Sequence, residues 1–127
     1  MFIVLKIPYL TIKMPNNKST LLKANTPITQ GDYEGFLQHC TEDTLWTFVG
    51  DTTLRGKEAV RQWMAENYIE PPVFEVEQLI AGDDHVIAMG KITVRDKKGN
   101  LITSSYCDVW RFENGKMAEL NAYVVAH

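Results

Sequence analysis

Apolar residues recur every three or four positions in the first half of the chain and alternate with polar residues in the second half. The first spacing places apolar side chains on one face of a helix, whereas alternation is typical of a strand with one buried face. The predicted helices run from Asn17 or Ser19 to Pro27, from Gly31-Asp32 to Cys40 and from Lys57 to Tyr68, with a short strand over 44–49.

Four longer alternating segments follow, and short loops rich in Gly, Asn and Asp separate them. Such loops join antiparallel neighbours, so these segments are predicted to form a meander. Helices followed by a meander indicate an α+β domain, with helices packed on one face of a curved antiparallel sheet. The predicted strands are Val73–Ile80, His85–Arg95, Leu101–Phe112 and Lys116–Ala126.

Loop lengths also predict which residues of neighbouring strands face each other. Pairing Arg95 with Leu101 fixes one register, and pairing Phe112 with Lys116 fixes the other. In both registers the neighbouring strands present apolar residues on the face that carries Asp108. The residues opposite Asp108 are then Ala88 and Leu120.

Asp108 is the only carboxylate on its face of the strand, where the other residues are Ile102, Ser104, Tyr106, Trp110 and Phe112. Burial of an unpaired carboxylate costs several kcal/mol by order of magnitude, so a purely structural sequence would avoid it or supply donors. Loss of solvation would raise the pKa of Asp108 and suit it to general acid or base catalysis. The alternative is a structural aspartate held by Tyr106, a backbone amide or a buried water.

Small residues on the neighbouring strands leave the space over the sheet unfilled, which predicts a cavity beneath the helices; they are Ala88, Gly90, Ala118 and Ala122. The opposite face of the sheet mixes apolar and polar residues, which predicts a homodimer formed through it. Its members are Thr103, Ser105, Cys107, Val109, Arg111, Met117, Glu119, Asn121, Tyr123 and Val125.

Composition narrows the possible functions. The chain has 127 residues and a net charge of −3, which fits one domain and gives no positive field for nucleic acid. Its two cysteines and three histidines favour neither a disulfide framework nor a metal cluster, so we expect a cytoplasmic protein without metal or cofactor. The apolar run Phe2–Leu5 is too short for a secretory signal or membrane span. We expect residues 1–15 to be a loosely ordered extension, with Met14 an alternative start, and 16–127 to be the domain.

Four blocks of the sequence resemble the SnoaL-like branch of the nuclear transport factor 2-like superfamily, over about residues 18 to 126. They are Gly31-Asp32-Tyr33-Glu34-Gly35-Phe36, Trp46-Thr47-Phe48-Val49-Gly50, Gly56-Lys57-Glu58-Ala59-Val60 and Tyr106-Cys107-Asp108-Val109-Trp110-Arg111-Phe112-Glu113-Asn114-Gly115-Lys116. The resemblance implies a cone-shaped α+β domain, commonly dimeric, whose curved sheet wraps three helices around an apolar pocket. It also implies either cofactor-free chemistry next to a carbonyl or noncatalytic binding, because fold alone selects no activity.

Ketosteroid isomerases of this superfamily keep one aspartate protonated in their oxyanion hole, and that aspartate matches Asp108. This chain has Ala24 at the position of their oxyanion-hole tyrosine and Thr47 at the position of their proton-shuttling carboxylate, and neither residue can perform those roles. A Δ5-ketosteroid isomerase is therefore disfavoured. The acid/base aspartate of SnoaL-type cyclases also matches Asp108, whereas the Asp-Arg-Asp set of limonene epoxide hydrolases has no match here.

Two functions remain open. The first is a cofactor-independent isomerase, cyclase or hydratase-type lyase that binds a hydrophobic carbonyl compound. The second is a noncatalytic module that binds a small ligand or forms a dimeric interaction surface, and a scaffold with a filled core is a further alternative. For the enzyme, the predicted catalytic residues are Asp108 as acid/base and Tyr106 as auxiliary donor, and the predicted substrate contacts are Thr47, Trp63, Trp110, Leu120 and His39. His39 could alternatively be a boundary residue of its helix.

Overall fold

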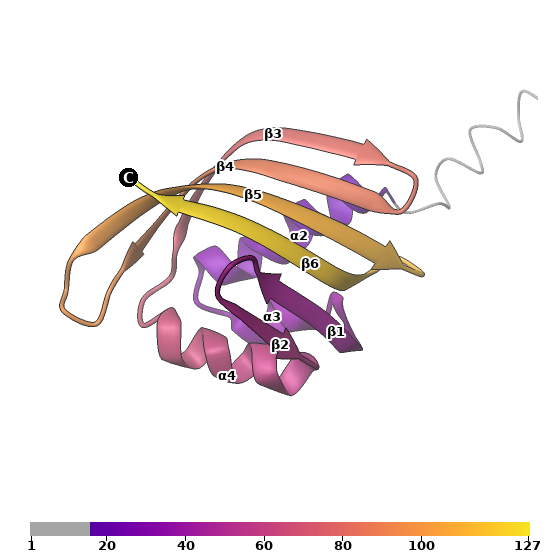
Figure 1. The fold of residues 1–127 in the computed structure, drawn as a ribbon. Coiled ribbons are helices and arrows are strands. Elements are labelled where there is room, and N and C mark those ends of the chain that lie inside the picture. Colours follow the sequence, from indigo (N-terminus) through magenta and orange to yellow (C-terminus); the bar gives the residue numbers. More distant parts are fainter. Residues whose placement is uncertain (1–15) are drawn as a thin grey trace, which may run out of the picture.

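A curved six-stranded sheet and three helices make up residues 16–127, the part of the chain that the computed structural model describes (Figure 1). The predicted extension 1–15, including Met14, lies outside the described residues. The helices are α2 (Asn17–Thr29), α3 (Tyr33–Leu37) and α4 (Lys57–Asn67). The strands are β1 (Cys40–Phe48), β2 (Thr52–Arg55), β3 (Val73–Gly82), β4 (His85–Arg95), β5 (Leu101–Glu113) and β6 (Lys116–Ala126).

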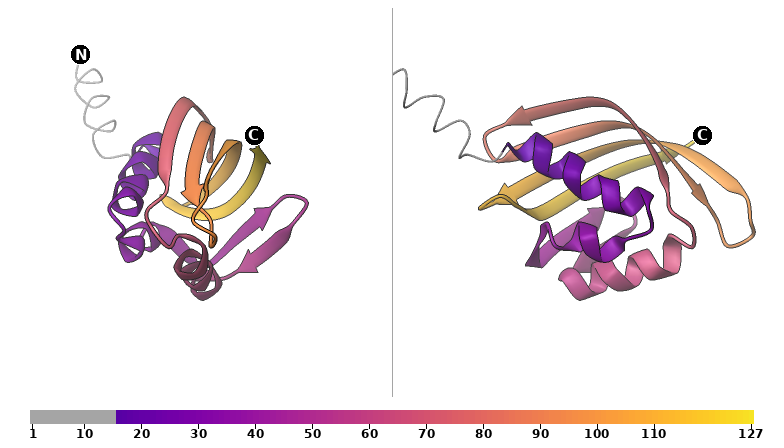
Figure 2. Two further views of the ribbon diagram at one scale, coloured as in Figure 1. Left: turned by 90° about the vertical axis from the view of Figure 1, so that its left-hand side faces the viewer. Right: turned by 180° about the vertical axis from the view of Figure 1, so that it is seen from behind.

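Helices α2 and α3 begin at side chains that cap them. The side chain of Asn16 accepts hydrogen bonds from the backbone amides of Lys18 and Ser19, and that of Asp32 accepts one from Gly35. Helix α2 continues two residues beyond its predicted end, because Pro27 lies in the last turn and removes only one backbone donor there. All three helices pack against the concave side of the sheet (Figure 2).

The end of α3 and the strand β2 differ from the prediction. Helix α3 is only five residues long, and Cys40, expected on its apolar stripe, is the first residue of β1. Cys40 is nevertheless fully buried with Phe36 and Leu37, so the stripe marks the core correctly. Strand β2 was not predicted, because its four mostly exposed residues at the sheet edge show no apolar alternation.

The strand order is β2-β1-β6-β5-β4-β3. Strands β3 to β6 form the predicted antiparallel meander, but β1 pairs with β6 in parallel, so the sheet is mixed. Loop signals describe only neighbours in sequence, and β1 is separated from β6 by most of the domain. The α+β class with a curved sheet around three helices is confirmed.

The register between β4 and β5 is the predicted one, with Asp108 opposite Ala88. The register between β5 and β6 corrects the prediction, because Glu113 rather than Phe112 pairs with Lys116. A two-residue turn with positive φ at both positions makes that connection, and a bulge follows it. Asp108 therefore lies opposite Ala122 instead of Leu120, and a shift of two residues leaves its face unchanged.

The bulge also moves Met117. It was expected on the outer face of the sheet, but it pairs with Phe112 and is fully buried in the core. The bulge breaks the alternation along β6, so that Met117 and Ala118 are both buried. None of the helices that the structure describes has the length and apolar character needed to span a bilayer.

Candidate functional site

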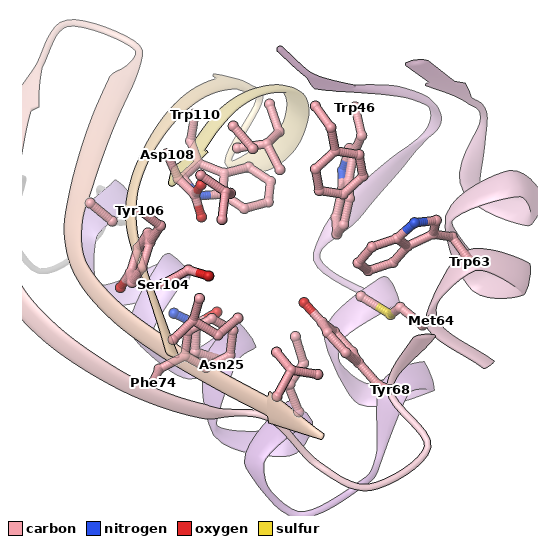
Figure 3. Close-up of a pocket in the computed structure, with 18 of the residues that line it drawn as sticks. Asn25, Trp46, Trp63, Met64, Tyr68, Phe74, Ser104, Tyr106, Asp108 and Trp110 are labelled. Carbon is pink, nitrogen blue, oxygen red and sulfur yellow. The ribbon is translucent and has the colours of Figure 1, made fainter. Parts of the chain in front are cut away.

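A cavity of about 340 Å³ lies between the concave face of the sheet and the helices (Figure 3). Every long strand from β4 to β6 contributes to its wall, and α2, α3, α4, β1 and β3 complete it. Most of the lining is apolar, and aromatic rings supply much of it: Phe36, Trp46, Phe48, Trp63, Phe74 and Trp110. The predicted cavity is therefore present.

Contacts between the aromatic rings hold these walls in place. Trp63 of α4 stacks on Phe48 of β1, with ring centroids 4.8 Å apart and an angle of 26° between the planes. Trp46 meets Trp110 edge to face at 5.6 Å and 84°. These are the offset and edge-to-face geometries that aromatic pairs favour. The rings therefore form a preorganised wall for an apolar or planar ligand.

Asp108 projects into this cavity from the middle of β5 (Figure 3). Its cross-strand neighbours, Ala88 and Ala122, carry only methyl groups, so the space around the carboxyl is left open. Burial raises the pKa of Asp108 to about 7, and no hydrogen bond from a described residue offsets the lost solvation. The carboxyl can therefore exchange a proton near neutral pH.

Tyr68, which caps the C-terminus of α4, directs its hydroxyl into the same cavity on the side across from Asp108 (Figure 3). Its pKa is raised, first by burial and second by the negative charge of Asp108. The group therefore stays a neutral phenol and a hydrogen-bond donor. Tyr33 fixes the helix end, because its hydroxyl donates to the Tyr68 carbonyl oxygen at 2.9 Å.

Sequence reasoning missed Tyr68 as a functional residue. One signal was available: a tyrosine at the end of an amphipathic helix, just before Pro71-Pro72, often has an apolar body and a polar tip. The direction in which the chain turns after the helix decides where that tip points. That direction follows from the docking of α4 and is not visible in local spacing.

Two further polar side chains, Ser104 and Asn25, line the cavity. Ser104 is 7% exposed, and its hydroxyl points into the space, as does the amide end of Asn25 from α2 (Figure 3). The indole nitrogen of Trp46 is buried with no hydrogen-bond partner among residues 16–127. The Ser104 hydroxyl and the Asn25 amide are therefore candidates for contacts with a bound ligand, whereas the Trp46 nitrogen is an unpaired buried donor, which is costly.

Five of the predicted site residues meet at the cavity: Asp108, Tyr106, Trp63, Trp110 and Leu120. The ring of Tyr106 packs edge to face on Phe74 at 6.0 Å, and its hydroxyl points away from the centre of the space (Figure 3). Burial, followed by the charges of Asp108 and Glu77, raises the pKa of Tyr106 to about 12. Its role as an auxiliary donor stays a prediction.

The structure does not bring Thr47 and His39 to the cavity. Alternation along β1 sends Trp46 and Phe48 inward, and the Thr47 hydroxyl instead lies 3.5 Å from that of Thr53. His39 follows α3 and lies outside the lining. Burial lowers the pKa of His39, and the charges of two lysines, Lys23 and Lys116, add to the effect.

Three solved structures illustrate the likeness of this fold to known proteins. A nuclear transport factor 2-like protein of unknown function from Burkholderia pseudomallei is 22% identical, with a TM-score of 0.76 over 86% of this chain and 90% of that one. An uncharacterised cystatin-fold protein from Novosphingobium aromaticivorans is 16% identical, with a TM-score of 0.75 over 86% and 98%. TerC, co-crystallised with polyporic acid, is 18% identical, with a TM-score of 0.72 over 84% and 88%. At these identities the likeness shows the fold alone.

No functionally curated protein matches the sequence. The family model of the SnoaL-like domain matches residues 25–120, which include α3, α4, β1 to β5 and most of the cavity wall. The match covers well over half of the chain, in agreement with the resemblance carried by the four sequence blocks. The chain belongs to the SnoaL-like domain family.

Proposed function

We propose that this protein binds a hydrophobic carbonyl compound, with the carbonyl in the cavity, and transfers a proton at the carbon next to that carbonyl, as an isomerase or cyclase does. The observation that carries the proposal is the Asp108 carboxyl, whose pKa is about 7, in an apolar cavity opposite the phenol of Tyr68. A base with a pKa near ambient pH is present in its active form and still returns the proton readily. The crystal of TerC with polyporic acid supports a small-molecule ligand for this fold.

In the proposed reaction, the Asp108 carboxylate removes a proton from the carbon next to the carbonyl. The electron pair of that C–H bond forms a new C=C bond, and the carbonyl π electrons move to oxygen. The Tyr68 hydroxyl donates a hydrogen bond to this developing oxyanion. Where the enolate is conjugated with a second C=C bond, it takes the proton back from Asp108 at the far carbon of that system. In a ring closure its carbon instead attacks a second carbonyl, whose π electrons move to oxygen, and the resulting alkoxide takes the proton from Asp108.

Proton exchange tests the proposal without knowledge of the natural substrate. Deuterium incorporation into an aromatic ketone such as 2-tetralone in D₂O, followed by proton NMR, reports enolisation directly. We expect exchange faster than in buffer. The absence of any acceleration, while the ketone quenches tryptophan fluorescence on binding, would contradict the catalytic role.

Tyr68→Phe is expected to slow this exchange by about 100-fold or more, because loss of one oxyanion-hole donor typically costs about 100- to 1000-fold in rate. Fluorescence titration should show little change in ketone affinity, since the phenyl ring keeps its edge contact with Trp63. Tyr123→Phe, which removes an exposed hydroxyl from outside the cavity, is the matched control. Equal exchange rates in the two variants would remove Tyr68 from the mechanism.

The second candidate function is noncatalytic ligand binding. It is favoured by the scarcity of acid/base groups in the cavity, because Asp51 is the only other carboxylate that residues 16–127 contribute to the lining. Ala24 is fully buried in the core, and Thr47 faces away. Ketone binding with exchange no faster than in buffer would favour this alternative.

We also propose that two copies pair through the outer face of the sheet. Exposed apolar side chains lie on this face on both sides of β5, on β3, β4 and β6: Ile80, Met89, Tyr123 and Val125. Cys107, between Met89 and Tyr123, is a free cysteine, which fits a reducing cytoplasm.

Light scattering should give twice the 14.5 kDa chain mass, and Tyr123→Glu should lower the measured mass toward that of the monomer. Leu22→Glu, which changes an equally exposed residue on α2, is the control and should leave the measured mass unchanged. A monomeric wild type would refute the pairing.

A further inference from the structure

A second recess adjoins the cavity between the end of α4 and the β4–β5 hairpin. It has a volume of about 600 Å³. The two spaces share four lining side chains, Trp63, Tyr68, Val94 and Ile102. The two spaces therefore adjoin at these four side chains, and the outer recess is the space next to Tyr68 on the far side from Asp108.

The cavity and the recess differ in charge. The charged residues that line the cavity are both acidic, Asp108 and Asp51, and no lysine, arginine or histidine is among its lining residues within 16–127. The lining of the outer recess contains three cations and two carboxylates: Arg95, Lys97, Lys98, Glu66 and Asp96. The charged side chains of the cavity are therefore acidic, whereas those of the outer recess are mixed, with more cations than carboxylates.

Two of these outer residues already have partners. Arg95 donates from Nε to Glu70 at 3.1 Å and from a terminal nitrogen to the Gly99 carbonyl oxygen at 2.6 Å. The Asp96 carboxylate accepts hydrogen bonds from two backbone amides of its own hairpin, at 2.9 and 2.8 Å, which lower its pKa.

Lys97 and Lys98 form no ion pair with any residue in the described part of the chain, and neither does Glu66. With Arg95 and Asp96 engaged, two lysines and one glutamate are left to meet a ligand. The charge available in the recess is therefore positive.

We propose that the ligand is an elongated amphiphile, with its neutral carbonyl ring system at Asp108 and an anionic end, such as a carboxylate, at Lys97 and Lys98. This inference rests on the proposed function, which places the carbonyl in the cavity. A carboxylate at the inner end would lie beside Asp108, where two like charges in an apolar site repel each other. At the recess the same group gains a cation and keeps its hydration.

Two matched probes test this orientation: a naphthyl ketone whose alkyl chain ends in a carboxylate, and its methyl ester. Titration by tryptophan fluorescence should show the acid binding about two- to fivefold more tightly than the ester, the range expected for exposed ion pairs. The double variant Lys97→Gln/Lys98→Gln should remove this preference, and about 0.5 M salt should reduce it. Lys23→Gln/Lys116→Gln, which changes two exposed lysines outside the recess, is the matched control and should keep the preference.

Equal affinity of the two probes for the wild type, or an acid preference that survives in the Lys97/Lys98 variant, would overturn this inference and leave the proposed function intact. Binding of neither probe would overturn the ligand class of the proposed function and this inference with it. An acid preference that depends on the two lysines, without any proton exchange on the ketone, would support the ligand class and contradict only the catalysis.

Discussion

Asp108→Asn is expected to abolish proton exchange on a bound ketone, with a loss of at least about a hundredfold. The amide keeps the size of the side chain but cannot accept the proton. In the wild type the active form is the carboxylate, so the exchange rate should rise with pH and level off above an apparent pKa near 7. Exchange measured by NMR from pH 5 to pH 9 gives this profile.

The same substitution is expected to stabilise the fold at alkaline pH. A carboxyl whose pKa rises from 3.8 to about 7 on folding binds more protons in the native state than in the unfolded state between these values. Stability therefore falls as pH rises through this window, by up to about 4 kcal/mol at full ionisation. Asparagine does not ionise, so the variant avoids this loss.

Urea unfolding of both proteins at pH 4, 6 and 8 measures the difference. The free energies of unfolding should be close at pH 4, and the variant should be more stable by an amount that grows toward pH 8. Asp43→Asn, at an exposed position of β1, should show no such trend. A constant difference across pH, or a less stable variant at pH 8, would mean that Asp108 is held by groups that favour its charge. In the separate exchange experiment, proton exchange by Asp108→Asn at the wild-type rate would show that Asp108 has no catalytic role.

The position of Asp108 could be predicted because it depends on local rules. Alternation fixes the face of a strand, and the loop 96–100 fixes the register between β4 and β5, so Ala88 was correctly placed opposite the carboxyl. An error of two residues in the register of β6 replaced Leu120 by Ala122 but changed no side-chain face. A shift by an even number of residues keeps every side chain on the same face of the sheet, so the prediction of the cavity was not affected.

The missing parts of the prediction depend on contacts between distant segments. Strand β1 joins the meander by pairing with β6, and no loop connects these two strands, so the side of the sheet that Thr47 faces could not be predicted from spacing. Tyr68 reaches the cavity because α4 docks under the sheet and Tyr33 holds its last turn. Both facts come from the packing of helices on the sheet, which local periodicity does not specify.

The close approach of β3 to β4 beside the cavity requires a residue without a side chain at position 90. This residue lies opposite Val76 of β3, next to a bulge between Val76 and Gln78, and the bulge brings the Glu75 carbonyl oxygen over the glycine. A β-carbon at Gly90 would overlap that oxygen and lie 3.1 Å from the Glu77 backbone nitrogen. Both are backbone atoms, so relief requires β3 to move away from β4.

Gly90→Ala is therefore expected to destabilise the protein by about 1 to 3 kcal/mol in urea unfolding, the range typical of overpacking. Gly82→Ala is the matched control, since a β-carbon there meets nothing within 4 Å and the change should stay within about 0.5 kcal/mol. Because Phe74 on β3 lines the cavity, the alanine variant should also bind the ketone more weakly, as seen by fluorescence titration. Equal stability of the two alanine variants would mean that β3 can shift at no cost, and the bulge would then not determine the shape of the site.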